Sequence, residues 1–134
     1  MNKQKAWDAV EAAVMEALGV EVEDVTPDAT IMDELGAESI DVLDMLFRVE
    51  RKVGVKIKAA DLAAHLQGGI PDDEFGDENE IVTPRGLAHL KTVMPQIDLA
   101  ALAGRLEAKS VIKLFTVQNL ADLVEQRAAA NQAA

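Results

Sequence analysis

The amphipathic stretch that begins at Ser39 constrains the fold of this chain more than any other feature. Apolar residues recur there at helical spacing, and they fall within one narrow stripe when each residue is turned by about 100°. The stripe consists of Val42, Met45, Leu46, Val49 and Val53. This pattern predicts a helix that places one face in a hydrophobic core.

A second apolar set lies to one side of the stripe. It contains Ile40, Leu43 and Phe47, and Asp44 and Glu50 border it. A helix that only covers a core rarely needs a second apolar row. The pattern therefore indicates a contact ridge edged with carboxylates, available to a partner.

A loop with several special residues leads into this helix and ends at Ser39. A serine in the first turn is a common cap, because its oxygen can accept from unpaired backbone N–H groups. Gly36 permits the close approach of another backbone, Leu35 can anchor the loop, and Glu38 and Asp41 flank the hydroxyl. Two roles are open for Ser39: a helix cap, or a functional hydroxyl.

The segment Leu-Gly-Ala-Glu-Ser-Ile-Asp at residues 35–41, with the apolar and acidic pattern through Ile57, resembles the acyl carrier proteins. Their serine, in a Leu-Gly-x-Asp-Ser-Leu setting, carries a 4′-phosphopantetheine arm. The resemblance covers residues 3–58 and 115–127. It implies an all-α, acyl-carrier-like four-helix bundle with the arm on Ser39. Glu38 and Ile40 replace the usual Asp and Leu but keep charge and polarity.

The resemblance also implies a function without an active site. Such a protein is not an enzyme; it holds acyl intermediates as thioesters and presents them to fatty acid or specialised lipid or polyketide biosynthetic enzymes. The implied partners are a phosphopantetheinyl transferase and acyl-synthesising or acyl-transferring enzymes with basic docking surfaces. The expected docking residues on this chain are Glu38, Ile40, Asp41, Asp44, Phe47 and Glu50. Positive residues on the same helix are more numerous than the family commonly shows and leave the identity of the partners open: Arg48, Arg51 and Lys52.

Two other functions are compatible with the same sequence. An aminoacyl or peptidyl carrier would use the same arm on a similar fold. An interaction domain could keep the carrier fold without being modified. An enzyme is disfavoured, because no base that could activate Ser39 is found in the sequence.

Composition excludes further classes of function. The chain has 13 Lys and Arg against 24 Asp and Glu, a formal net charge of −11, which argues against binding to nucleic acid or anionic membranes. It has no Cys, so a reactive thiol must belong to the arm. No segment approaches the roughly 20 apolar residues of a membrane span. We expect a cytoplasmic monomer.

The flanking segments fit such a carrier. Residues 3–18 predict an amphipathic helix that ends at Gly19, and a long connection follows to residue 38. Residues 55–57 predict a short extended link. Thr116 is expected to cap a last helix from Val117, with a fraying tail at residues 128–134.

Residues 59–114 do not match the family pattern and are interpreted as a helical insertion within a single carrier domain, residues 1–134. Two or three short helices are expected: residues 59–67, residues 84–93 after a Thr83 cap, and a helix capped by Asp98 with Leu99, Leu102, Ala103 and Leu106 on its apolar face. The insertion either enlarges the core or packs near the arm as a lid or docking surface.

Two features of this segment raise the question of metal binding. The acidic run at residues 72–80 lacks EF-hand spacing and is expected to be a mobile, solvated loop. The two histidines, His65 and His89, belong to no zinc-binding motif.

Overall fold

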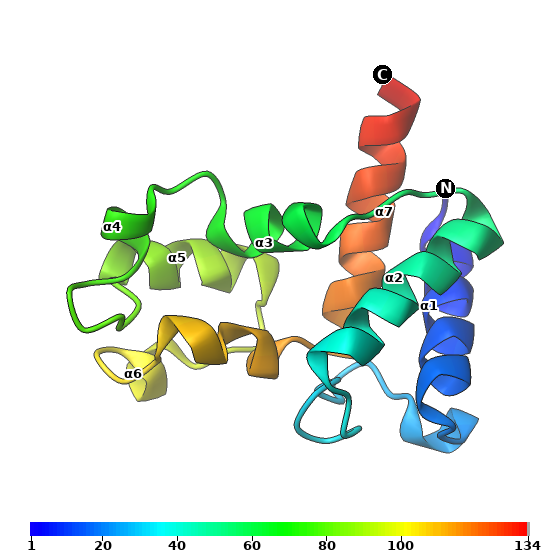
Figure 1. Ribbon diagram of the computed structural model, residues 1–134, viewed down its shortest axis with the longest axis horizontal. Coiled ribbons are helices and arrows are strands. Elements are labelled where there is room, and N and C mark those ends of the chain that lie inside the picture. The colour runs from blue at the N-terminus through cyan, green and yellow to red at the C-terminus, as the bar shows by residue number, and fades with distance from the viewer. Residues whose placement is uncertain (134) are drawn as a thin grey trace.

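The computed structural model describes residues 1–133, and within this range the chain is helical with only isolated β-bridges. Figure 1 shows two groups of helices joined side by side. The first contains α1, α2 and α7; the second contains α3 to α6. The predicted all-α fold is confirmed.

The first group is built on three long helices: α1 (Lys3–Leu18), α2 (Ser39–Val53) and α7 (Val117–Ala133). Helix α1 packs against both α2 and α7. The predicted stripe of α2 faces the core, since Val42, Met45, Leu46 and Val49 are buried. Gly19 ends α1 in the left-handed conformation, φ 68°, as expected for a helix stop.

The connection from α1 to α2 is held to the start of α7. It contains one 3₁₀ turn, η1 (Val22–Asp24). The N–H of Ile31 donates to the Phe115 carbonyl at 3.0 Å, and the N–H of Val117 donates to the Ala29 carbonyl at 3.0 Å. Ala29 and Ile31 are buried. The loop before Ser39 is therefore held by buried side chains and by backbone hydrogen bonds to the start of α7.

The second group contains α3 (Ala59–Gln67), α4 (Asp72–Phe75), α5 (Pro84–Val93), α6 (Leu99–Leu102) and the 3₁₀ helix η2 (Ala108–Leu114). Helix α5 packs on both α3 and α4. The Thr83 and Asp98 side chains accept from backbone N–H groups of α5 and α6, so both predicted caps are confirmed. We call these residues, 59–114, the second lobe.

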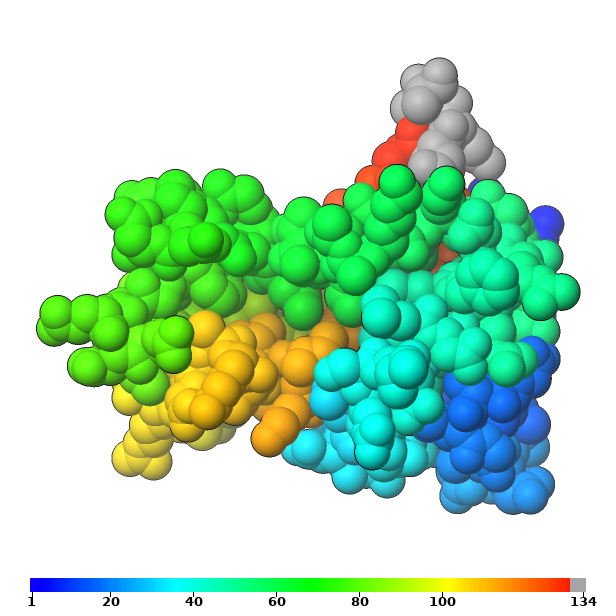
Figure 2. All heavy atoms as spheres, in the orientation of Figure 1, coloured from blue at the N-terminus to red at the C-terminus, as the bar shows by residue number. Residues whose placement is uncertain are grey.

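The two lobes share one hydrophobic core. A single cluster of buried side chains runs from Val10 and Val14 of α1 to Leu87 and Leu90 of α5. Figure 2 shows the second lobe (green to orange) in continuous contact with the bundle. Burial of apolar surface therefore couples the lobes.

The structure corrects several sequence predictions. The second lobe has more helices than expected. Helix α6 ends at Leu102, because Ala103 turns extended and Gly104 adopts φ 73°; Leu106 is buried outside the helix. Helix α7 continues to Ala133, through the segment from Ala128 for which fraying is predicted. Ala134 lies outside the described residues.

The acidic run at residues 72–80 is also more structured than predicted. Its first four residues form α4. Asp77 Oδ1 then accepts from the N–H groups of Asn79 and Ile81 at 2.8 and 3.0 Å, closing a turn. The N–H of Asp77 donates to the Ile81 carbonyl at 2.9 Å. The run therefore consists of one helical turn and a hydrogen-bonded hairpin-like turn.

Candidate functional site

Ser39 is the first residue of α2, and it is not the cap. Glu38 occupies the cap position, and its N–H donates to Asp41 Oδ2 at 2.9 Å. Ser39 is exposed, and its hydroxyl has no hydrogen-bond partner in the described part of the chain. The capping role considered from the sequence is therefore taken by Glu38 with Asp41, and the Ser39 hydroxyl is available for chemistry.

The loop before Ser39 is rigidly built. Gly36 adopts φ 78°, a conformation that favours glycine. The N–H of Leu35 donates to the Thr30 carbonyl, and the N–H of Ala37 donates to the Ile31 carbonyl, both at 3.1 Å. Ala37 is buried at the entrance to the helix. These contacts hold Ser39 at a fixed position on the surface.

The environment of Ser39 fits a covalently attached phosphopantetheine. The arm is joined through a phosphodiester, which is an anion. The start of a 15-residue helix carries a partial positive charge from its unpaired N–H groups. The first backbone N–H groups of α2 that donate within the helix belong to Asp41 and Val42. The N–H groups of Ser39 and Ile40 are thus free to face an anion attached at this serine.

The predicted contact ridge is exposed on the outer face of α2. Ile40, Leu43 and Phe47 have 71%, 47% and 56% of their surface accessible. Arg51 follows one turn after Phe47, and its guanidinium carbon lies 5.8 Å from the centre of the Phe47 ring. We call Ile40, Leu43, Phe47 and Arg51 the α2 ridge.

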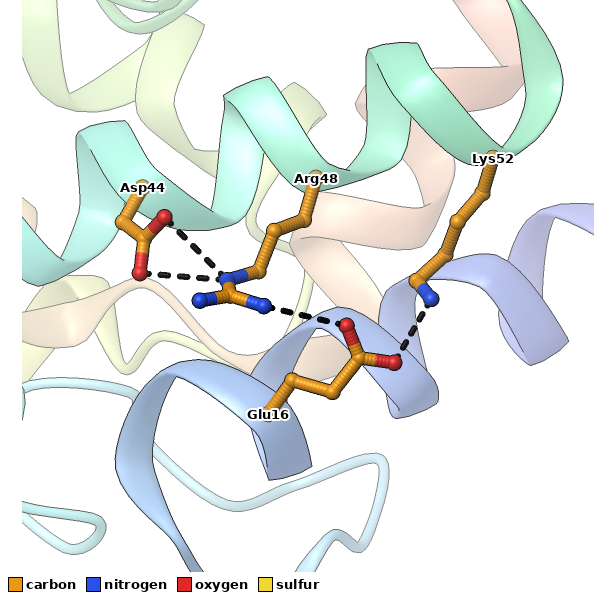
Figure 3. Close-up of polar contacts among 4 residues, drawn as sticks. All are labelled: Glu16, Asp44, Arg48 and Lys52. Carbon is orange, nitrogen blue, oxygen red and sulfur yellow. Dashed lines mark hydrogen bonds and ion pairs between the residues drawn. The ribbon is translucent and has the colours of Figure 1, made fainter.

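Some of the acidic residues predicted to dock partners are engaged within the protein. Figure 3 shows Arg48 Nε donating to both oxygens of Asp44 at 3.1 Å, and Arg48 Nη1 donating to Glu16 at 3.1 Å. Lys52 Nζ donates to the other Glu16 oxygen at 2.6 Å. Asp41 is engaged by the Glu38 N–H. Glu38 is exposed, and Glu50 is half-buried.

These ion pairs shift two pKa values. The hydrogen bond from Lys52, with a further contribution from Arg48, lowers the pKa of Glu16. The hydrogen bond to Asp44, followed by that to Glu16, raises the pKa of Arg48. Both pKa shifts favour the charged forms of Glu16 and Arg48.

Sequence reasoning missed two polar contacts of the second lobe. Within the lobe, His89 Nε2 lies 2.9 Å from the His65 carbonyl oxygen, and across the lobes Gln96 Nε2 donates to Asn119 Oδ1. No motif predicts either contact, because the four residues lie on four separate segments. In residues 1–133, no group of three or more His, Cys, Asp or Glu is arranged to hold a metal ion. Among the helices described, none is long and apolar enough to cross a membrane.

Comparison with known proteins defines the class of this site. A family model described as "Phosphopantetheine attachment site" matches residues 8–67, from α1 through α3. The match includes Ser39, the loop before it and all of α2. The fold and the match define a carrier whose cofactor is a covalently attached 4′-phosphopantetheine.

Relatives specify the family. The acyl carrier protein of Thermotoga maritima is 36% identical over 61 residues, which are 46% of this chain and 75% of that protein. The acyl carrier protein of Guillardia theta is 32% identical over 72 residues, 52% of this chain and 89% of that protein. That of Helicobacter pylori is 37% identical over 51 residues, 38% of this chain and 65% of that protein. The chain belongs to the acyl carrier protein family, whose members are carriers and not enzymes. No solved structure matches it.

Proposed function

We propose that Ser39 carries the 4′-phosphopantetheine arm and that the protein presents acyl thioesters to enzymes of fatty acid or specialised lipid or polyketide biosynthesis. One observation supports this most strongly. An exposed hydroxyl without a hydrogen-bond partner in the described structure stands at the positive end of α2, inside the segment that matches the attachment-site family. Because the chain has no Cys, the arm supplies the thiol that holds the acyl group.

The test is modification by a phosphopantetheinyl transferase with coenzyme A, followed by intact mass spectrometry. We expect one addition of the mass of the arm to the wild-type chain and none to Ser39→Ala. The chain contains only one other serine, Ser110, so Ser110→Ala is a matched control that should be modified normally. A folded wild-type chain that no transferase modifies would support an unmodified interaction domain instead.

A thiol assay gives an independent readout. The unmodified chain has no thiol, because it has no Cys. One reactive thiol per chain should therefore appear on modification, and Ser39→Ala should show none. Mass spectrometry of protein purified from its native host would then identify the cargo. An amino acid or peptide on the arm would favour the aminoacyl or peptidyl carrier alternative.

We further propose that residues 1–134 form a single carrier domain and that the second lobe after α3 is an insertion in it. The shared core supports this, although the family match continues through α3 to residue 67. The insertion would then begin near Gly68, which ends α3 in the left-handed conformation with φ 68°. A role in the cytoplasm as a monomer fits a carrier that meets several enzymes in turn.

The docking residues on α2 belong to the same proposal. Ile40 and Phe47 offer apolar contact, and Glu38 offers an exposed charge to a basic group on the partner. Three other acidic residues are less available for docking. Asp41 and Asp44 form hydrogen bonds within the protein, and Glu50 is half-buried.

A further inference from the structure

A shallow groove lies between α3 and the 3₁₀ helix η2 in the second lobe. It has a volume of about 180 Å³, and six apolar residues line it: Ala63, Leu66, Phe75, Ala108, Val111 and Ile112. Leu66, Phe75 and Val111 are buried, whereas Ala63 is exposed. The groove therefore has an apolar floor and is open to solvent. We call it the α3–η2 groove.

Two polar side chains, Gln67 and Lys109, also border the groove, and both have partners within the protein. Gln67 Nε2 donates to the Ile70 carbonyl at 2.7 Å and to Asp72 Oδ1 at 2.6 Å. Lys109 Nζ forms an ion pair with Glu107 at 3.3 Å. The remaining surface of the groove is apolar and gains from removal of water by an apolar occupant.

Backbone hydrogen bonds connect this groove to the loop before the attachment residue. The N–H of Phe115 donates to the Ile112 carbonyl at 3.1 Å, and the N–H of Ile31 donates to the Phe115 carbonyl at 3.0 Å. The N–H of Ala37, two residues before Ser39, donates to the Ile31 carbonyl at 3.1 Å. Figure 2 shows α3 (green), the segment that contains η2 (orange) and the segment before Ser39 (cyan) on one face of the molecule. The groove is therefore close to Ser39.

The arm is long enough to cover such a separation. It consists of a phosphate, a pantoyl unit, a β-alanyl unit and a cysteamine unit in line. Each unit is about as long as one extended residue, so the arm spans more than about 13 Å. An acyl chain on its thiol is thus held near the groove by a tether, which raises its local concentration there. Each methylene removed from water favours binding by about fourfold, so long chains bind best.

We propose that the α3–η2 groove receives the acyl chain carried by the arm, so that the second lobe holds long hydrocarbon cargo outside the three-helix group of α1, α2 and α7. The inference rests on the proposed role of Ser39. Phe75, Val111 and Ile112 lie beyond residue 67, where the match to the attachment-site family ends. The groove is therefore a feature of the second lobe, and it does not belong to the segment that matches the family.

The first test locates the acyl chain directly. A phosphopantetheinyl transferase loads the full chain from acyl-coenzyme A of increasing length, from acetyl to hexadecanoyl, and intact mass verifies each product. Nuclear Overhauser effects between acyl methylenes and protein methyl groups are then measured. We expect contacts of the hexadecanoyl chain with Val111 and Ile112. Contacts only with Met45 and Val49, which are fully buried, would place the chain inside the bundle and overturn the inference.

Thermal unfolding gives a second readout. A ratio of docked to free chain of about ten raises Tm by about 5 °C, so the hexadecanoyl form should be more stable than the acetyl form by this amount. Ala63→Trp fills the groove and should abolish the difference. Ala64→Trp is the matched control, because Ala64 is the next residue, is also exposed and lines a separate depression with His65 and Arg127. It should keep the difference.

Two results of the thermal test contradict the inference. One is a gain in Tm that Ala63→Trp leaves unchanged, and the other is an equal loss of the gain in Ala63→Trp and Ala64→Trp. If Ala63→Trp does not fold, the Overhauser contacts of the wild-type chain decide. In each of these cases the mass still shows an arm on Ser39. A wild-type chain that gains no mass would overturn the role of Ser39 itself.

Discussion

Asn119 is the residue whose replacement best tests how the two lobes are joined. Its Oδ1 accepts from the Thr116 N–H at 3.0 Å and from Gln96 Nε2 at 2.7 Å. Its Nδ2 donates to Gln96 Oε1 at 3.2 Å and to the Val93 carbonyl at 3.4 Å. Asn119 and Thr116 are only 2% and 3% exposed. One amide therefore completes the cap of α7 and ties it to the end of α5.

The cost of Asn119→Ala follows from these contacts. The buried Thr116 N–H loses its acceptor, which costs about 1–3 kcal/mol. Loss of the two hydrogen bonds that the Asn119 amide donates costs about 1 kcal/mol more. We expect a loss of about 2–3 kcal/mol in the free energy of unfolding. For a chain of 134 residues this lowers Tm by about 7–10 °C.

Gln96→Ala is the control, because Gln96 is exposed and its loss leaves Thr116 paired with Asn119. It should cost less than about 1 kcal/mol. Urea unfolding followed by circular dichroism and by fluorescence of Trp7, the single tryptophan, measures both variants. Equal costs for the two variants would refute the assignment of the stability to the buried cap.

Three further predictions concern the second lobe. Gly68→Ala should destabilise the protein more than Gly54→Ala. Both glycines have positive φ, which costs an alanine about 1–2 kcal/mol, but only at Gly68 would the new methyl group clash with a side chain, the His89 ring. Equal losses of Tm for the two variants would exclude the clash. Leu90→Ala, at a fully buried site, should cost about 2–5 kcal/mol in one cooperative urea transition, and separate transitions of the lobes would contradict a shared core. Burial, followed by the charge of His89, lowers the pKa of His65, so the stability from its neutral form is complete above pH 6.5 and lost as pH falls through the folded-state pKa. His65→Gln should flatten the dependence of Tm on pH between 7.5 and 5, and an unchanged slope would reject this.

The sequence by itself determined most of the helices and the candidate attachment site. Residues 3–18, 39–53, 59–67 and 84–93 form helices with the predicted bounds, because apolar periodicity and local caps act within a few residues along the chain. The motif around Ser39 is equally local, and the family match includes it.

Local patterns failed where a competing local contact or a distant segment decided the structure. Ser39 was a plausible cap, but Asp41 closes the cap on the Glu38 N–H and leaves the serine hydroxyl exposed. The helix predicted from Leu99 stops at Leu102, where Ala103 and Gly104 leave the helical conformation, and Leu106 is buried outside it. These outcomes depend on three-dimensional packing, which propensity does not describe.

Only the tertiary structure decided which charges on α2 form ion pairs. In the sequence, Asp44 and Arg51 are two more charges on a helix that carries both signs. Packing of α1 against α2 brings Glu16 to Arg48 and Lys52, and Arg48 in turn engages Asp44. Ion pairing across 32 and 36 residues of sequence cannot be read from a local pattern, because it depends on how the helices are placed against one another.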